Sequence, residues 1–259
     1  MSGNNSSAPT DDAFLGGVLK VLQPRTGYRA GLDAVLLAAA TPVRAGDRVL
    51  DAGSGVGVVG LCIAAREAGA HVTLVEKATE LVGLAEQNIV RNGLQDRVSV
   101  VEADVTGPAR VLMLAGLGSD SFSHVVINPP FHTEGHGRRP RSAIKAAAHA
   151  MPAGQLARWI AFAARVAMPD GTLTIVHRAD ALTELLGRVD GRFGALKLLP
   201  IYPRAGAQAS RILLQGRKGS RAPLTILPGL ILHGDNNEFR PNVAGILRHG
   251  EPLDLSGKV

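Results

Sequence analysis

Three glycines at alternate positions constrain the fold of this chain more than any other feature of its sequence. They lie in the stretch Asp51-Ala-Gly-Ser-Gly-Val-Gly57, between a short apolar run and a longer one. Because glycine has no Cβ, the backbone here can turn tightly, adopt positive φ and approach a ligand closely. The stretch therefore predicts a strand, a ligand-binding loop and the start of a helix. The candidate ligand contacts are Asp51, Gly53, Ser54, Gly55 and Gly57.

Two classes of cofactor fit this loop. Gly55-Val-Gly57-Val-Val-Gly60 matches the dinucleotide-binding fingerprint, which requires an acidic residue roughly 20 positions further on, where the chain has Glu76. Alternatively, an acidic residue two positions before Gly53, followed by alternating glycines, resembles the nucleoside-binding loop of S-adenosylmethionine-dependent methyltransferases. In both interpretations Glu76, at the carboxyl end of the next expected strand, accepts hydrogen bonds from the ribose hydroxyls. The loop alone does not decide between them.

From residue 47 onward, short β-branched runs alternate with longer runs that are rich in Ala and Leu. Such alternation predicts parallel strands joined by helices, which cover both faces of the sheet. Two consecutive strand-like runs at 196–202 and 210–215 predict an antiparallel pair. The expected fold is therefore α/β, a seven-stranded, mostly parallel, doubly wound sheet (Rossmann-like) with a C-terminal antiparallel strand pair. The other expected strands are 48–52, 72–76, 98–102, 123–127 and 172–177, and the expected helices are 57–68, 79–92, 153–168 and 180–188.

No linker or internal repeat divides the chain, so we expect one main domain with an extension at each end. Residues 14–23 predict a short hairpin around two adjacent glycines, residues 32–40 predict an apolar helix, and residues 224–232 predict an edge strand. The expected organisation is a disordered tail at 1–11, an N-terminal extension of hairpin, loop and helix at 12–46, the main domain at 47–233 and a C-terminal tail at 234–259.

The composition excludes several classes of protein. The single cysteine, Cys62, rules out a disulfide framework within the chain, and the histidines lack the short fixed spacing of zinc ligands, so we expect no metal site. The N-terminus lacks the regions of a signal peptide, and no apolar run approaches the roughly 20 residues of a membrane span. A cytoplasmic protein is expected. The formal charge of +6 favours an anionic partner.

The motif Asn128-Pro-Pro-Phe131 follows the fourth expected strand and indicates chemistry on an amine. Two prolines, Pro129 and Pro130, end the strand rigidly and fix the directions of the Asn128 amide and the Pro129 carbonyl. The exocyclic amine of an aromatic base is a poor nucleophile, because its lone pair is delocalised into the ring. Two oxygen acceptors would hold the N–H groups of this amine and support the positive charge that develops on its nitrogen. Phe131 would stack on the base.

In order and spacing, Asp51 to Gly57, Glu76, Asp104 and Asn128 to Phe131 resemble an amino-directed class I methyltransferase. The wider chain, from about residue 20 to 233, is similar to the bacterial tRNA adenine-N6 methyltransferase family that modifies valine tRNA. The resemblance implies S-adenosylmethionine as the cofactor, and Asn128, Pro129, Pro130 and Phe131 as the catalytic residues. The cofactor-binding residues that it implies are Asp33, Asp51, Gly53, Ser54, Gly55, Gly57, Glu76, Lys77, Asp104 and Asn128.

Several alternatives stay open. Asp104 either accepts a hydrogen bond from the adenine amino group of the cofactor or caps the following turn. Asn-Pro-Pro-Phe/Tyr occurs in enzymes that act on adenine N6, guanine N2 and glutamine N5, and Phe131-His132 is similar to the ribosomal RNA guanine-N2 enzymes. Adenine N6 in tRNA is the expected target, with guanine N2 of ribosomal RNA or protein glutamine N5 as alternatives. The rivals of a different class are a nicotinamide-dependent oxidoreductase and a non-catalytic RNA-binding protein.

Two basic stretches indicate an RNA partner. Residues 135–169 contain no acidic residue, and neither do residues 191–234. The first stretch begins directly after the catalytic motif, where an RNA backbone would lie if its base entered the pocket. We expect RNA contacts from Arg138, Arg139, Arg141, Lys145 and Arg204, and the first stretch also contains Arg158 and Arg165.

Overall fold

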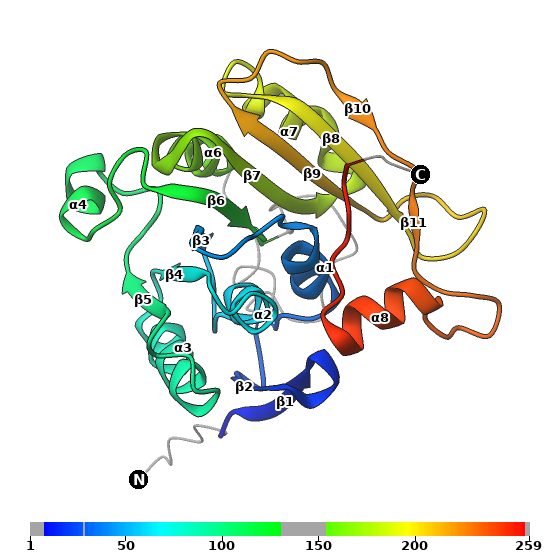
Figure 1. Ribbon diagram of the computed structural model, residues 1–259, viewed down its shortest axis with the longest axis horizontal. Coiled ribbons are helices and arrows are strands. Elements are labelled where there is room, and N and C mark those ends of the chain that lie inside the picture. Colours follow the sequence, from blue (N-terminus) through cyan, green and yellow to red (C-terminus); the bar gives the residue numbers. More distant parts are fainter. Residues whose placement is uncertain (1–7, 28, 131–153, 257–259) are drawn as a thin grey trace, which may run out of the picture.

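A computed structural model of the chain describes residues 8–27, 29–130 and 154–256. Its core is a nine-stranded sheet, in which two of the strands, β10 and β11, are only two residues long (Figure 1). The strands are β3 (Arg48–Ala52), β4 (His71–Glu76), β5 (Val98–Glu102), β6 (Phe122–Ile127), β7 (Ala167–Arg178), β8 (Phe193–Tyr202), β9 (Arg211–Lys218), β10 (Thr225–Ile226) and β11 (Leu230–Ile231).

The order of the strands confirms the expected fold class. The sheet runs β10-β8-β9-β7-β6-β3-β4-β5, and the five strands from β7 to β5 pair in parallel. Strand β9 is antiparallel to both of its neighbours, β7 and β8, as expected for the C-terminal pair. The two short strands pair in parallel with β8 and extend that edge, so the single strand expected at 224–232 is in fact two pieces.

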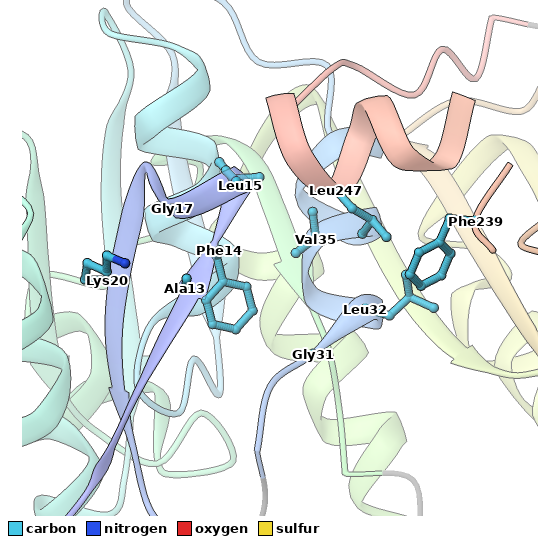
Figure 2. Close-up of a pocket in the computed structure, with 11 residues that line it drawn as sticks. Ala13, Phe14, Leu15, Gly17, Lys20, Gly31, Leu32, Val35, Phe239 and Leu247 are labelled. Atoms are coloured by element: carbon cyan, nitrogen blue, oxygen red, sulfur yellow. The ribbon is translucent and has the colours of Figure 1, made fainter. Parts of the chain in front are cut away.

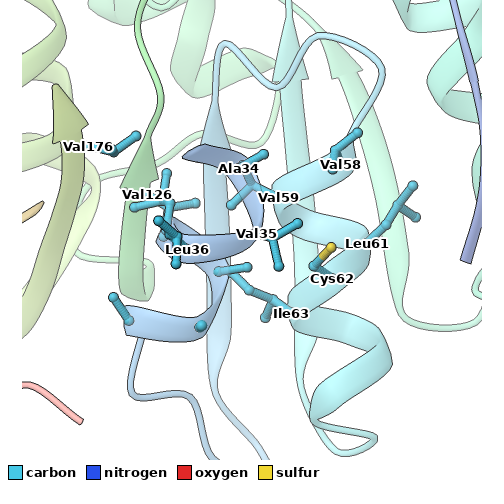
Figure 3. Close-up of a cluster of buried hydrophobic side chains, with 14 of the residues drawn as sticks. Ala34, Val35, Leu36, Val58, Val59, Leu61, Cys62, Ile63, Val126 and Val176 are labelled. Atoms are coloured by element: carbon cyan, nitrogen blue, oxygen red, sulfur yellow. The ribbon is translucent and has the colours of Figure 1, made fainter. Parts of the chain in front are cut away.

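Helices cover both faces of the sheet, because the strands are apolar on both sides. Val126 of β6 faces one buried cluster, together with residues of α1 and α2, whereas Val125 and Ile127 of the same strand face the other cluster. Figure 3 shows residues of α1 and α2 packed together beside Val126 and Val176. The helices are α1 (Leu32–Ala40), α2 (Val58–Arg66), α3 (Thr79–Arg91), α4 (Ala109–Leu114), α6 (Gln155–Val166), α7 (Leu182–Val189) and α8 (Pro241–His249).

The N-terminal hairpin and helix α8 pack together at one side of the domain (Figure 1). The predicted hairpin forms from β1 (Thr10–Phe14) and β2 (Leu19–Gln23), joined by a 3-10 turn at Leu15–Gly17. Strand β1 begins at Thr10, inside the stretch expected to be a disordered tail. Helix α8, which the sequence did not predict, packs against this turn and α1. A Cβ at Gly16 would lie 2.6 Å from the Arg248 carbonyl oxygen, so only glycine allows this contact.

The expected boundary between helix 153–168 and strand 172–177 is wrong. Helix α6 ends at Val166, and strand β7 begins at the next residue. The register to β6 shifts here, from Phe122 opposite Ala167 to His124 opposite Thr172. Residues 168–171 therefore form a bulge within β7 rather than the end of a helix.

Candidate functional site

The two sequence motifs meet where the direction of strand progression reverses. The chain adds β4 and β5 on one side of β3, and β6 and β7 on the other. In such sheets, ligands bind beyond the carboxyl ends of the strands at this reversal. Ala52 of β3 and Ile127 of β6 are register partners, so Gly53 and Asn128 follow two paired residues. The glycine loop and the Asn-Pro-Pro motif therefore leave the sheet side by side.

The glycine loop combines two tightly packed glycines with one open glycine. Gly53, Gly55 and Gly57 all have positive φ, at 66°, 58° and 92°. A Cβ at Gly53 would lie 2.2 Å from the Trp159 ring, and one at Gly57 would lie 2.7 Å from Leu74 Cδ1. At Gly55 no atom of the described residues lies within 4 Å of the Cβ position. Gly55 therefore provides the open backbone surface that the sequence predicted for a ligand.

Glu76 holds this loop from the end of β4. Its carboxyl oxygen Oε2 accepts a hydrogen bond from the Gly55 amide, and Oε1 accepts from the amides of Lys77 and Ala78, each at 2.9 Å. The side chain is buried. Beside it, the buried hydroxyl of Ser54 has no hydrogen-bond partner among the described residues. A ribose-like ligand over Gly55 fits this arrangement, because carboxylate oxygens accept more than one hydrogen bond each.

Asp51 is buried near the end of β3 and is bonded to the start of α2. Its Oδ2 atom accepts a hydrogen bond from the Gly60 amide, in the first turn of α2, at 3.0 Å. Burial away from water, together with the nearby charge of Glu76, raises the pKa of Asp51 to about 7, although the Gly60 amide opposes this shift. Asp51 therefore links β3 to α2 and takes up a proton far more readily than a surface aspartate.

Asp104 makes turn-capping contacts, which are one of the two roles expected from the sequence. Its Oδ1 atom accepts hydrogen bonds from the Thr106 amide at 2.8 Å and the Thr106 hydroxyl at 2.7 Å. Burial acts to raise the pKa of Asp104, but these bonds and the charges of Lys77 and Arg158 outweigh it, and the pKa is lowered. Asp104 is exposed, next to Lys77, on the same rim as Glu76.

Two of the implied contacts have protein partners. Asp33, in the first turn of α1, forms an ion pair with Arg211 at the start of β9, with an Nε–Oδ2 distance of 3.0 Å. Arg204 donates a hydrogen bond to the Asn237 side-chain oxygen at 2.6 Å.

Asn128 is buried, with 8% of its surface exposed, and Pro129 is buried beside it. Phe131, Arg138, Arg139, Arg141 and Lys145 lie outside the described residues.

Sequence reasoning did not select Trp159 of α6. The indole ring packs over Gly53 and is 9% exposed, and Nε1 has no hydrogen-bond partner among the described residues. The only available signal was its rarity, because it is the single tryptophan of the chain.

No group of three metal-ligating side chains occurs in the described part of the chain. None of the helices described there is long and apolar enough to span a membrane.

An apolar cavity of about 470 Å³ lies away from this site, between the hairpin, α1 and α8 (Figure 2). Its walls include Phe14, Leu32 and Phe239. Neither the glycine loop, nor Glu76, nor Asn128 lines it. This cavity is therefore separate from the rim where the motifs meet.

Comparison with known proteins identifies the family. Residues 30–198 match the family described as methyltransferase small domain. The crystal structure of a predicted O-methyltransferase from Agrobacterium tumefaciens is 31% identical in sequence, with a TM-score of 0.73, over 85% of this chain and 98% of that one. Two curated relatives are tRNA1(Val) (adenine(37)-N6)-methyltransferases. The one from Aeromonas hydrophila is 27% identical over 75% of this chain and 79% of its own length. The one from Tolumonas auensis is 30% identical over 60% of this chain and 61% of its own length, which is less than two thirds.

These matches decide between the two cofactor classes. The match spans the glycine loop, Glu76, Asp104 and the Asn-Pro-Pro motif, and it supports a methyltransferase rather than a nicotinamide-dependent enzyme. The open glycine and the carboxylate beside it suit the nucleoside part of a methyl donor. The chain belongs to the methyltransferase small domain family and is a methyltransferase whose cofactor is S-adenosylmethionine.

Proposed function

We propose that this enzyme methylates the exocyclic N6 amine of an adenine in tRNA. The observation that carries the proposal is that Asn128-Pro129 leaves the sheet beside the glycine loop. Curated relatives named as tRNA adenine-N6 methyltransferases support tRNA as the substrate class. Because tRNA is the substrate, the cytoplasm is the proposed location.

The cofactor would lie along the rim formed by Gly55, Glu76 and Asp104. Glu76 would accept hydrogen bonds from the ribose hydroxyls, and its backbone bonds already hold its oxygens in place. Asp104 would face the adenine end with its Oδ2 atom, while its Oδ1 atom accepts from Thr106. Asp33 and Lys77 remain proposed neighbours of the cofactor. When bound, S-adenosylmethionine supplies an electrophilic methyl group on a positively charged sulfur.

The acceptor amine would be held by Asn128 and Pro129. The Asn128 side-chain oxygen and the Pro129 carbonyl oxygen would accept its two N–H bonds, which favours pyramidal nitrogen and makes its lone pair available. The same two oxygens would stabilise the positive charge that the nitrogen acquires as it takes up the methyl group, and the nitrogen would then lose one proton to water. Phe131 would stack on the base. A strong general base is not required, because the charged amine is itself acidic.

One experiment distinguishes adenine from the other possible methyl acceptors. The purified enzyme is incubated with S-adenosylmethionine and, separately, with tRNA, ribosomal RNA and a glutamine-containing protein substrate. Mass spectrometry of the digested products then identifies the methylated group. We expect N6-methyladenosine in tRNA. Detection of N2-methylguanosine or N5-methylglutamine instead would contradict this proposal. So would an O-methylated product, which the name of the Agrobacterium tumefaciens relative suggests.

A further inference from the structure

A groove of about 310 Å³ runs along the outer face of α6. Its opposite wall is the segment that follows β5, including Thr106 and Gly107. Figure 1 shows α4 next to α6 on this side of the molecule. The groove is distinct from the apolar cavity near the hairpin, because two arginines of α6, Arg158 and Arg165, line it. We call it the Arg158–Arg165 groove.

The two arginines lie on one face of α6. They are seven residues apart, which is close to two helical turns and places them roughly 10 Å apart along the axis. Arg158 is exposed. The Arg165 guanidinium lies over the Phe162 ring, and its Nη1 donates to the Leu117 carbonyl oxygen at 3.2 Å. Its Nη2 atom is buried without a hydrogen-bond partner among the described residues.

The groove keeps a net positive charge within the described part of the chain. Neither arginine is within ion-pair distance of a carboxylate in the described ranges. Of the nearby acids, Asp120 is paired with Lys218 at 2.6 Å, and Asp104 interacts with the charge of Arg158 but forms no ion pair with it within 4 Å. No acidic residue lines the groove. Its chemistry therefore suits an anion.

The groove begins at the rim of the methyl-transfer site. Thr106 lines it and donates to Asp104, and the charge of Arg158 is close enough to lower the pKa of Asp104. Arg158 also precedes Trp159, whose ring contacts Gly53 of the glycine loop. A nucleic-acid strand with one base beside the glycine loop would therefore have its neighbouring phosphates close to α6.

We propose that the Arg158–Arg165 groove binds backbone phosphates of the RNA strand that flanks the target nucleotide. The proposal rests on the proposed function, because it assigns the groove to the same RNA. Guanidinium groups remain charged at all physiological pH values and attract phosphate. Arg158, which is exposed, could also offer a phosphate two parallel hydrogen bonds, whereas Arg165, whose Nη2 is buried, would contribute mainly its charge. Two such groups roughly 10 Å apart suit a chain of phosphates better than a single phosphate ion.

The test is the salt dependence of RNA binding. The dissociation constant for tRNA is measured at several NaCl concentrations for the wild type, Arg158→Gln, Arg165→Gln and the double variant. Each lost phosphate contact should reduce the slope of log affinity against log salt by roughly 0.7–0.9, so the double variant should lose about 1.4–1.8. Arg165→Lys keeps the charge and should keep most of the slope, which separates phosphate binding from packing on Phe162.

Arg44→Gln is the matched control. Arg44 is exposed, and it lies in the turn before β3, at the opposite end of that strand from the glycine loop. This variant loses the same charge and should keep the wild-type slope. Binding of S-adenosylhomocysteine should be unchanged in all variants. A wild-type slope in the double variant, or an equal loss of slope in Arg44→Gln, would overturn the proposal.

The outcome is independent of the proposed methylation. If the wild type binds tRNA but forms no N6-methyladenosine, the function fails while the slopes still decide the groove. If tRNA is methylated and the double variant keeps its slope, only the groove proposal fails.

Discussion

The Glu76 carboxylate and the Gly55 amide, 21 positions apart in the sequence, are joined by a hydrogen bond of 2.9 Å. This bond connects the end of β4 to the one glycine of the loop that faces open space. The other carboxyl oxygen holds the amides of Lys77 and Ala78. A single side chain thus holds both the glycine loop and the turn that follows β4. Four predictions about the site and its surroundings can be tested.

Replacing Glu76 with Ala should weaken cofactor binding. Two ribose hydroxyls lose their acceptor and the Gly55 amide loses its partner, so the free energy of binding should fall by about 1.5–3 kcal/mol. Calorimetry with S-adenosylhomocysteine measures this. Glu102→Ala is the control, because Glu102 is the register partner of Glu76 on β5 but is exposed, and within the described ranges its side chain accepts only from the Thr79 hydroxyl. Equal affinities for the Glu76 variant and the wild type would reject the ribose role.

Alanine at Gly53 and at Gly55 should give different defects. Both positions have positive φ, which costs an alanine about 1–2 kcal/mol of stability. At Gly53 the new methyl group also meets the Trp159 ring, and overpacking should add about 1–3 kcal/mol. At Gly55 it meets no protein atom and instead occupies the proposed cofactor space. Gly55→Ala should therefore melt closer to the wild type and bind S-adenosylhomocysteine about tenfold more weakly, or worse. Wild-type affinity in Gly55→Ala would contradict the placement of the ligand.

Asp51 should make stability depend on pH. Because its pKa is raised to about 7 in the folded state, the folded protein binds more protons than the unfolded chain between about pH 4 and 7. The contribution of Asp51 to the free energy of unfolding should therefore be largest below pH 4 and decline as pH rises to 7, by at most about 1.4 kcal/mol per pH unit. Asp51→Asn keeps an acceptor for the Gly60 amide and cannot ionise.

Urea unfolding of the wild type and Asp51→Asn at several pH values checks this prediction. The stability of the variant relative to the wild type should increase from pH 4 to 7 and then level off. A constant difference across this range would mean that the Asp51 carboxyl titrates like an ordinary aspartate.

Replacing Asn128 with Ala should reduce turnover far more than binding. The contact between the Asn128 oxygen and the amine strengthens as the nitrogen gives up its lone pair, so its loss acts mainly on the transition state. By analogy with oxyanion-hole donors, turnover should fall on the order of a hundredfold or more. Asn128→Asp keeps an acceptor and should retain more activity. Methyl transfer at saturating tRNA and cofactor is measured beside a melting curve, and full turnover in a folded Asn128→Ala enzyme would end the amine-positioning role.

The sequence predicted the parallel half of the sheet well, for a physical reason. Strands β3 to β6 are short β-branched runs bounded by turn residues, so each could be located from local composition alone. The bulge at 168–171 could not, because Pro-Asp-Gly ends a helix in one context and forms a bulge in another. Helix α8 was missed because its stability depends on packing against Gly16 and α1, which the local sequence does not encode.

Within the site, the side chains that follow strands were the predictable ones. Glu76 and Asn128 come directly after β-branched runs, and parallel strands bring their carboxyl ends to one edge. The ion pair between Asp33 and Arg211 joins residues 178 positions apart, and no sequence period links them. The contact of Trp159 with Gly53 also depends on how α6 lies over the sheet, which only the three-dimensional packing determines.

Because Trp159 contacts Gly53, the tryptophan fluorescence of the enzyme should respond to changes in the glycine loop. The chain has one tryptophan, so all of its indole fluorescence comes from a ring lying against the glycine loop. A ligand that changes the polarity or position of this loop will change the emission spectrum without any attached dye. Association and dissociation of the cofactor can therefore be followed in real time by stopped-flow mixing, with no background from a second tryptophan.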